Sequence, residues 1–264
     1  MCARLAVPVV ALTAVFLIAS PHAAAQCSST FTQQFNLERC HFTSTGDNPY
    51  FPLQPGTVSV LEGEEDGAET QLVVTVTCDT RLVTFTTPDG ATLKVKTRVV
   101  EERQVEDDEL VEVSRNFFAQ CRETGEVYYF GEETDLYEND EIVGHEGSWL
   151  AGEDDAQPGL VMPGTPLLGS RFFQEVAPDV ALDQAEIVAA CLTTEVPAGS
   201  FESCIRTRET TPLEPGAEEF KIYCPGVGLT IDSTLELTEQ SRTSCANDRG
   251  DDAQGAEARS RRRR

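Results

Sequence analysis

Histidines are the first residues to consider for catalysis, because a Ser-His-Asp triad needs one as its general base. The chain has three, and only His41 and His145 follow the apolar N-terminal segment. A triad would have to combine His145 with a serine such as Ser148 and one of the many acidic residues. No G-x-S-x-G elbow is present to expose a nucleophile. We therefore interpret His145 as a turn or surface residue beside a packed Trp149, and we assign no catalytic residue.

Carboxylates are the most abundant chemical groups. With 45 Asp and Glu in the chain, a pair suited to glycoside hydrolysis can be chosen anywhere by chance, so hydrolase is only a third hypothesis. The stretch 135–141 concentrates oxygen ligands of the kind that calcium takes. However, Tyr137 stands where an EF-hand loop needs Asp or Asn, and Asp140 stands in place of its Gly. A looser calcium loop stays open beside a solvated acidic hairpin tip, and we expect no other cofactor.

The N-terminus has the features of a secretory signal peptide. Arg4 precedes the apolar run 5–20, and the small residues 23–25 provide a cleavage site before Gln26. The run of about 16 residues is shorter than the roughly 20 that cross a bilayer. Gln26 also disfavours lipid attachment at Cys27, where the preceding residue is ordinarily Gly, Ala or Ser. We expect cleavage near Ala25 and a secreted or periplasmic protein with no membrane span.

Cysteines have a clearer use than the other reactive residues. Eight of the nine lie beyond the predicted cleavage site: Cys27, Cys40, Cys78, Cys121, Cys191, Cys204, Cys224 and Cys245. None of these pairs has the C-x-x-C spacing of a zinc site, and exported chains meet oxidising conditions. The sequence therefore predicts as many as four disulfides, which could connect in 105 ways.

Two specific pairings follow from local arguments. If residues 207–218 connect an antiparallel hairpin, Cys204 and Cys224 lie nearly opposite each other, close to the geometry of a bridged pair. Cys191 competes for Cys204 across the neighbouring turn. A second hypothesis pairs Cys27 with Cys40 in a small N-terminal loop.

The charge balance limits the classes of partner. Removing residues 1–25 takes away Arg4 and no acidic residue, so 45 Asp and Glu remain against 19 Lys and Arg, a net charge of −26. Nucleic acid and anionic membranes are poor partners for such a surface. A solvated surface that repels other copies is the simplest explanation, with several divalent-cation sites as the alternative. We expect a monomer whose partner is an unknown protein or small molecule.

Short alternating segments rich in Val, Thr and Phe predict β-strands, with turns close enough to make neighbouring strands antiparallel. The strands expected in the first half are 71–78, 81–86, 92–105, 110–120 and 127–130, with one further hairpin at 139–147. Those expected in the second half are 172–176, 185–194, 201–207, 218–223 and 229–237. No sustained helical periodicity is present.

The predicted fold class is all-β: a curved antiparallel sheet, either a β-roll or a partly open barrel. Residues 152–169 are crowded with Pro and Gly and predict an ordered crossover loop without a long element. We divide the chain into a signal peptide at 1–25, an N-terminal extension at 26–47, a single β domain at 48–240 and a disordered tail at 241–264.

Several motifs, in their order along the chain, resemble a largely uncharacterised family of secreted bacterial β proteins. The residues that carry the resemblance are NPYFPL at 48–53 with PG at 55–56, SRNFFA at 114–119, YFGE at 129–132, HEGSW at 145–149, PG at 158–159, MPG at 162–164, PAGSF at 197–201, TPLEPG at 211–216 and PGVGL at 225–229. The resemblance implies export and a predominantly β fold, and it implies no activity. The additional cysteines and the arginine-rich C-terminus differ from the family.

Two function classes remain ahead of the hydrolase. The first is a non-catalytic binding or structural module. The second is a carrier that wraps a small apolar ligand in the curved sheet, with phenylalanines as a lining: Phe117, Phe118, Phe130, Phe172, Phe173 and Phe201. Such residues are more often ordinary core. A void of several hundred Å³ lined by them would favour the carrier.

Overall fold

The computed structural model describes Phe31 to Cys245, and the predicted signal peptide, Cys27 and the arginine-rich end lie outside these residues. The described chain confirms the all-β prediction, since it folds into one antiparallel sheet with only a 3-10 turn, η1 (Leu37–Arg39). No helix among residues 31–245 has the length and hydrophobicity that crossing a membrane requires.

The strands follow one another with short connections. Those of the first half are β1 (Phe42–Thr43), β2 (Thr57–Glu65), β3 (Ala68–Thr86), β4 (Thr92–Glu106), β5 (Glu109–Cys121), β6 (Val127–Glu138), β7 (Glu141–Gly144) and β8 (Trp149–Leu150). Those of the second half are β9 (Gln157–Met162), β10 (Arg171–Phe173), β11 (Glu175–Val176), β12 (Gln184–Val196), β13 (Gly199–Thr210), β14 (Glu219–Cys224), β15 (Gly228–Asp232) and β16 (Leu235–Arg242).

The sheet curls into a nearly closed barrel. Its strand order is β10-β12-β13-β14-β15-β16-β2-β3-β4-β5-β6-β9-β11, so the two outermost strands are neighbours in the sequence. β10 pairs with β12 at one edge, and β11 pairs with β9 at the other. Gln174, between β10 and β11, donates its backbone N–H to the carbonyl of Asp183 at 2.7 Å. The segment 171–176 thus lies along the one unsealed seam.

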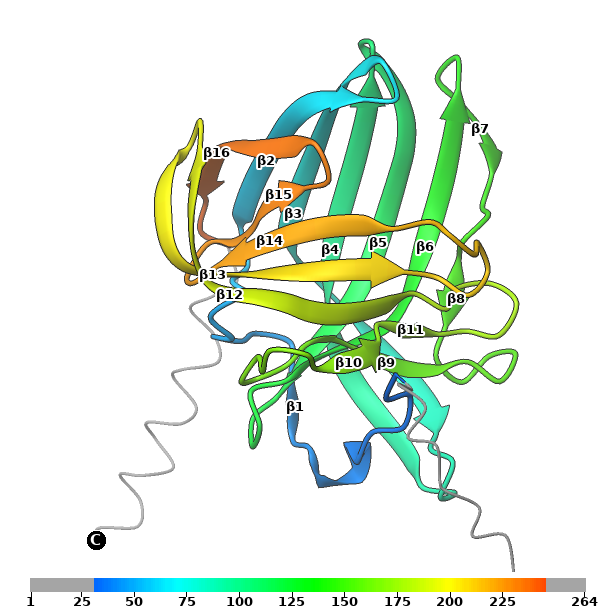
Figure 1. Ribbon diagram of the computed structural model, residues 1–264. Helices are drawn as coiled ribbons and strands as arrows, with labels where there is room; N and C mark the ends of the chain where they lie inside the picture. The colour runs from blue at the N-terminus through cyan, green and yellow to red at the C-terminus, as the bar shows by residue number, and fades with distance from the viewer. Residues whose placement is uncertain (1–30, 246–264) are drawn as a thin grey trace, which may run out of the picture. The chain divides into compact units, whose positions relative to one another are not determined.

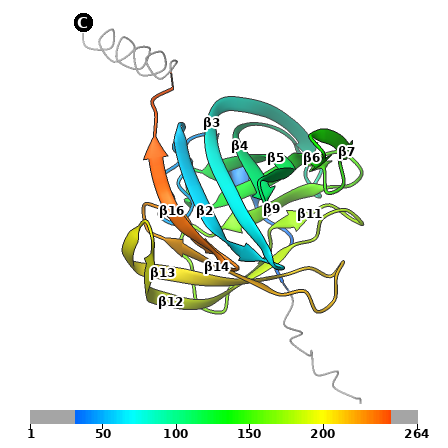
Figure 2. The same cartoon turned by 90° about the horizontal axis from the view of Figure 1, so that it is seen from above.

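Two groups of strands face each other. Figure 1 shows β3 to β6 running upright behind β12 to β14, which cross in front of them. Seen from above, β12 to β14 run along the lower side of the picture and β4 to β6 along the upper side (Figure 2). Because side chains alternate between the two faces of a strand, each strand of the two groups sends every second residue into the interior.

Four predicted elements need correction. The single strand expected at 172–176 is two short strands, β10 and β11, on opposite edges of the sheet. β3 is one strand of 19 residues, and the break expected between 78 and 81 is only a register shift between Val76 and Thr80. The loop predicted at 152–169 contains β9, a largely buried strand paired with β6. The strand predicted at 229–237 is two, β15 and β16, which turn at Ser233, where φ is 52°. β16 continues to Arg242, further than the predicted domain boundary.

Acidic hairpin tips account for part of the negative charge. Asp107 and Asp108 connect β4 to β5 with φ values of 47° and 68°, and Asn139 and Asp140 connect β6 to β7 with 50° and 64°. Two-residue turns with positive φ suit antiparallel hairpins, and Asp and Asn tolerate this conformation. These side chains are solvent-exposed.

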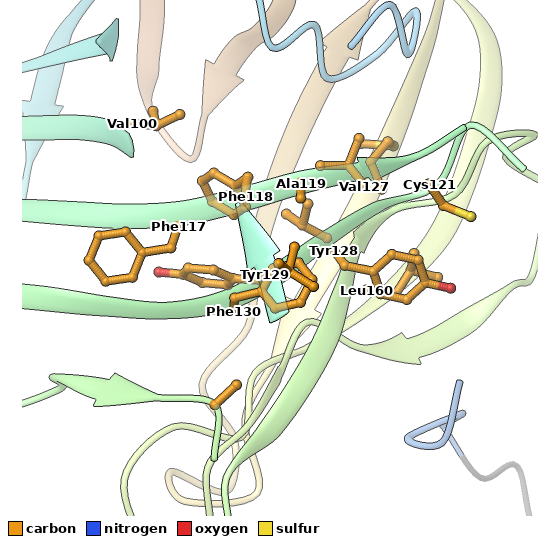
Figure 3. Close-up of a cluster of buried hydrophobic side chains, with 14 of the residues drawn as sticks. Val100, Phe117, Phe118, Ala119, Cys121, Val127, Tyr128, Tyr129, Phe130 and Leu160 are labelled. Atoms are coloured by element: carbon orange, nitrogen blue, oxygen red, sulfur yellow. The ribbon is translucent and has the colours of Figure 1, made fainter. Parts of the chain in front are cut away.

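Aromatic side chains form much of the core around β5 and β6. Phe117 and Phe118 leave β5 on opposite sides, as do Tyr128 and Tyr129 on β6 (Figure 3). On one face, the chain before β1 covers Tyr128, whose ring centroid is 5.5 Å from that of Phe35. Both faces of these strands are therefore packed, one of them by the N-terminal segment.

Three disulfides brace this sheet. Cys204 bonds to Cys224 across the β13–β14 hairpin, which confirms the predicted pair, since the register places Ile205 opposite Tyr223. Cys40 bonds to Cys121, so the predicted Cys27–Cys40 pair is wrong. β1 pairs with the end of β5 and brings these two residues together. The third joins Cys78 to Cys245, and Cys191 is the one free cysteine between residues 31 and 245.

Candidate ligand-binding site in the barrel interior

The barrel interior contains a half-open cavity of about 320 Å³ between its two groups of strands. Its walls come from β2 to β6 on one side, from β13 to β15 on the other, and from residues 51–53 and 174–175. Exposed Asp183 stands at the rim. The volume is within the range of small-molecule sites, roughly 300 to 1,000 Å³.

The alternation of β4 and β5 explains which side chains enter this cavity. Val100 lies opposite Asn116, Glu102 opposite Ser114 and Gln104 opposite Glu112. All six residues line the cavity or a second, neighbouring space beside β2 and β16. The residues between them, such as Arg103, point outwards. A carboxylate is thus placed inside the barrel by strand register.

The cavity is strongly acidic. Seven carboxylates line it, against a single lysine, Lys221; they are Glu102, Glu112, Glu132, Glu175, Asp183, Glu209 and Asp232. A connected space of about 190 Å³ shares four of these eight charged residues and adds Glu65 and Glu219. The lining therefore carries an excess of negative charge when its carboxyl groups are ionised.

Lys221 compensates two of the seven carboxylates. Its Nζ lies 3.2 Å from Oδ2 of Asp232 and 3.7 Å from Oε2 of Glu209. The three side chains are only 23%, 15% and 13% exposed, respectively. Burial lowers the pKa of Lys221, but the two carboxylates outweigh burial and raise it well above the usual value. Lys221 is therefore a fixed internal cation.

Glu102 has no such partner. Its carboxylate makes no hydrogen bond or ion pair with any residue from 31 to 245. Burial raises the pKa of Glu102 to about 7; Lys221 opposes the rise, and Asp232 and Glu112 add to it. Glu102 is consequently close to half ionised at neutral pH.

A hydrogen-bonded group of side chains from β5 and β6 also faces the cavity. The Tyr129 hydroxyl is a donor to Oδ1 of Asn116 and lies 3.1 Å from Oε2 of Glu132. Burial is the main cause that raises the pKa of Glu132 to about 8, so this carboxyl group holds a proton at pH 7. It can then donate to the Tyr129 oxygen while Tyr129 donates to Asn116.

Two residues of the seam segment, Gln174 and Glu175, line the cavity. Trp149 donates its indole N–H to Oε1 of Glu175 at 3.2 Å. Burial raises the pKa of Glu175 well above the usual value, with further contributions from Glu132 and Asp183. Gln174 donates its side-chain N–H to Oε1 of Glu209, also at 3.2 Å. The segment that lies along the seam is therefore fixed by polar contacts to both groups of strands.

Aromatic rings form the rest of the wall. The Phe118 ring centroid is 5.0 Å from that of Phe51 and 4.5 Å from that of Tyr129. Tyr223 is only 5% exposed, and its hydroxyl has no hydrogen-bond partner in the part of the chain that the structure describes. Since Tyr223 lines the cavity, this hydroxyl is available to a bound molecule.

The six phenylalanines that a carrier would use as a lining are mostly core residues, the interpretation that the sequence favoured. Of the six, only Phe118 lines this cavity. Phe117, Phe130 and Phe172 are buried core residues, and Phe173 and Phe201 are partly buried elsewhere. Sequence reasoning also missed the interior acids: alternation in β4 and β5 puts Glu102 and Glu112 on one face, but it does not show that this face is the inner one.

Other residues considered for chemistry lie outside the cavity. His145 is exposed, and its Nδ1 lies 2.9 Å from the Thr134 carbonyl and 3.0 Å from Oδ1 of Asp135. Ser148 accepts the backbone N–H of Thr134 at 2.9 Å. In the stretch 135–141, Asp135 binds Arg115 at 3.0 Å instead of converging with its neighbours on one point. These contacts stabilise the β6–β7 hairpin.

Metal ligands do not converge in the cavity. Between residues 31 and 245, the one group of three such side chains whose ligand atoms lie within 4.8 Å of one another is Cys40, Cys121 and Glu123. The two sulfurs of this group form a disulfide, so they are not thiolate ligands. The interior carboxylates are instead spread along the walls, an arrangement suited to a molecule larger than a bare ion.

Comparison of the chain with protein-family models, with curated proteins and with solved structures gives no significant match.

Proposed function

We propose that this protein is an exported, non-catalytic binding protein that holds a small polar molecule in its barrel interior. The observation that carries the proposal is the cavity of about 320 Å³ whose walls combine seven carboxylates, one lysine and several aromatic rings. Binding sites are concave and partly apolar, with a few polar groups that orient the ligand. This cavity has the same combination.

Export fits the covalent structure. Three disulfides join distant parts of the described chain, and such bonds persist in oxidising compartments. With the apolar N-terminal segment, they support a secreted or periplasmic location. The resemblance to secreted bacterial β proteins agrees with this location and adds no activity.

The alternative of a carrier for an apolar ligand receives less support. An apolar molecule would leave the interior carboxylates without partners, and burying unpaired polar groups is costly. Aromatic residues such as Phe51 and Phe118 can still contact the apolar part of a polar ligand.

Native mass spectrometry of the protein purified from its own source tests the proposal. We expect an added mass that disappears on denaturation. Ser114→Leu should remove this mass, because Ser114 is 3% exposed and lines the cavity. Thr84→Leu, on the exposed face of β3, is the matched control and should retain it. Equal retention by both variants would show that the ligand binds elsewhere, and no retained mass would count against the proposal.

A further inference from the structure

We propose that the ligand is a small organic cation, with an ammonium head at Glu102 and an apolar body against Phe51 and Phe118. This inference rests on the proposed function, because it assigns a chemical class to the molecule in the same cavity.

Charge is the first argument. Lys221 compensates Glu209 and Asp232. Glu132 and Glu175 have raised pKa values and hydrogen bonds to Tyr129 and Trp149, which leaves Glu102, Glu112 and Asp183 as the lining carboxylates without a cation. An anionic ligand would add to the repulsion in a region of low dielectric constant, and a neutral ligand would leave Glu102 and Glu112 without a counterion. A positive charge is the complement that the cavity lacks.

Unused hydrogen-bonding capacity is the second argument. Neither the Glu102 carboxylate nor the Tyr223 hydroxyl has a hydrogen-bond partner between residues 31 and 245, and both side chains line the cavity. Tyr223 is 5% exposed and lines the cavity. A primary ammonium group has three donors, so it can donate to Glu102 and to the Tyr223 oxygen.

The order of side chains along β5 is the third argument. Its inward-facing residues are Glu112, Ser114, Asn116 and Phe118. Glu102 pairs with Ser114, two inward positions before Phe118, or about 14 Å along the strand at roughly 3.4 Å per residue. The cavity thus changes from carboxylate to aromatic along its length, which matches a molecule with a cationic head and an apolar body.

An organic cation fits better than a metal ion. Of the described residues, no three of the lining carboxylates bring their oxygens within 4.8 Å of one another, whereas calcium takes six to eight oxygen ligands at about 2.3 to 2.6 Å. Aromatic rings such as Tyr129 also attract cations through the negative faces of their π systems.

Three probes of nearly equal size and shape test the class of ligand: 4-phenylbutylamine, 4-phenylbutanol and 4-phenylbutyrate. Each is titrated into the mature chain and followed by calorimetry and by NMR shifts of backbone amides. We expect the amine to bind at least 10-fold more tightly than the alcohol, and the butyrate not to bind. The shifts should cluster on β4, β5 and β14, the strands that carry Glu102, Phe118 and Tyr223.

Two variants locate the head group. Glu102→Gln should weaken amine binding at least 10-fold and leave the affinity for the alcohol unchanged. Glu64→Gln removes a charge from the exposed face of β2 and should change neither affinity. Circular dichroism and melting temperature establish that both variants fold. Equal weakening by both variants would mean that the amine responds only to the overall negative charge, which overturns the inference.

The remaining outcomes separate the two proposals. Binding of the butyrate or the alcohol as tightly as the amine, with shifts in the cavity, overturns the organic cation and leaves the binding function in place. If no probe shifts the cavity amides, the organic cation is overturned; if native mass spectrometry also detects no ligand, the binding function fails with it.

Discussion

Lys221 and Asp232 occupy directly paired positions on β14 and β15, and their side chains form an ion pair of 3.2 Å inside the barrel. Glu209 of β13 approaches the same ammonium group at 3.7 Å. Lys221, on β14, thus links carboxylates on the two neighbouring strands, β13 and β15. The barrel can tolerate acidic residues at inward positions partly because one internal cation offsets them.

Replacing Lys221 by Met should destabilise the protein, because two buried carboxylates would lose their counterion. Removing one partner of a buried ion pair typically costs about 3 to 5 kcal/mol. Chemical denaturation at pH 8 should reveal most of this loss, whereas at pH 4.5 protonation of Glu209, whose pKa is raised by burial, should relieve part of it. Lys96→Met, at an exposed position of β4, is the control and should change stability little. A loss that is the same at both pH values would contradict this role.

The contribution of Glu102 to stability should fall as pH rises from 4.5 to about 7. Burial raises the pKa of Glu102 from 4.5 to about 7, so in this window the folded state binds more protons than the unfolded state, and the free energy of unfolding decreases with pH. For a group that still contacts cavity water, we expect a loss of about 2 kcal/mol. This loss corresponds to roughly 5 °C in melting temperature.

Glu102→Gln provides the check on the pH effect. It should melt at a higher temperature than the unmodified protein at pH 8 and at nearly the same temperature at pH 4.5, because only the ionised carboxylate carries the penalty. Glu64→Gln should leave the pH dependence unchanged. If Glu102→Gln lowers the melting temperature at pH 8, Glu102 is stabilised by a partner that balances its burial.

Much of the strand pattern could be read from the sequence because alternation and turn residues are local signals. β9 could not, because Pro158 and Gly159 are typical of loops. The structure accommodates both: Pro158 lies near the start of β9, where a missing donor is tolerated. Gly159 allows a close approach, since a Cβ at this position would lie 2.0 Å from the Gln174 carbonyl oxygen.

The acidic interior could not be predicted with similar ease. Glu101 and Glu102 are adjacent and chemically identical, yet Glu102 lines the cavity while Glu101 faces Arg115 at 3.6 Å. Which of the two points inwards depends on which face of the sheet curls inwards. That choice is made by contacts between strands far apart in the sequence, such as β2 and β16, which pair with each other.

Each disulfide should stabilise the fold according to the length of chain that it closes. Chain entropy predicts about 3 kcal/mol for Cys204–Cys224, about 4.5 for Cys40–Cys121 and about 5 for Cys78–Cys245, because their sequence separations are 20, 81 and 167. Double serine variants, made one bridge at a time, should follow this order in denaturant midpoints. Peptide mapping without reduction checks the pairs, and a Cys191–Cys204 link would show that the β13–β14 register is wrong.

Gly159→Ala should open the barrel at its seam. The added Cβ would meet the carbonyl oxygen of Gln174 at 2.0 Å and the backbone nitrogen of Glu175 at 2.8 Å, so β9 and β11 would have to separate. We expect a loss of several kcal/mol in stability, together with faster amide exchange in residues 171–176. Gly90→Ala is the matched control. Gly90 has a φ of 90° but nothing within 4 Å of an added Cβ, so it should lose only about 1 kcal/mol through backbone strain. Equal losses in the two variants, with unchanged exchange at 171–176, would show that the seam does not depend on the close approach of Gly159 to Gln174.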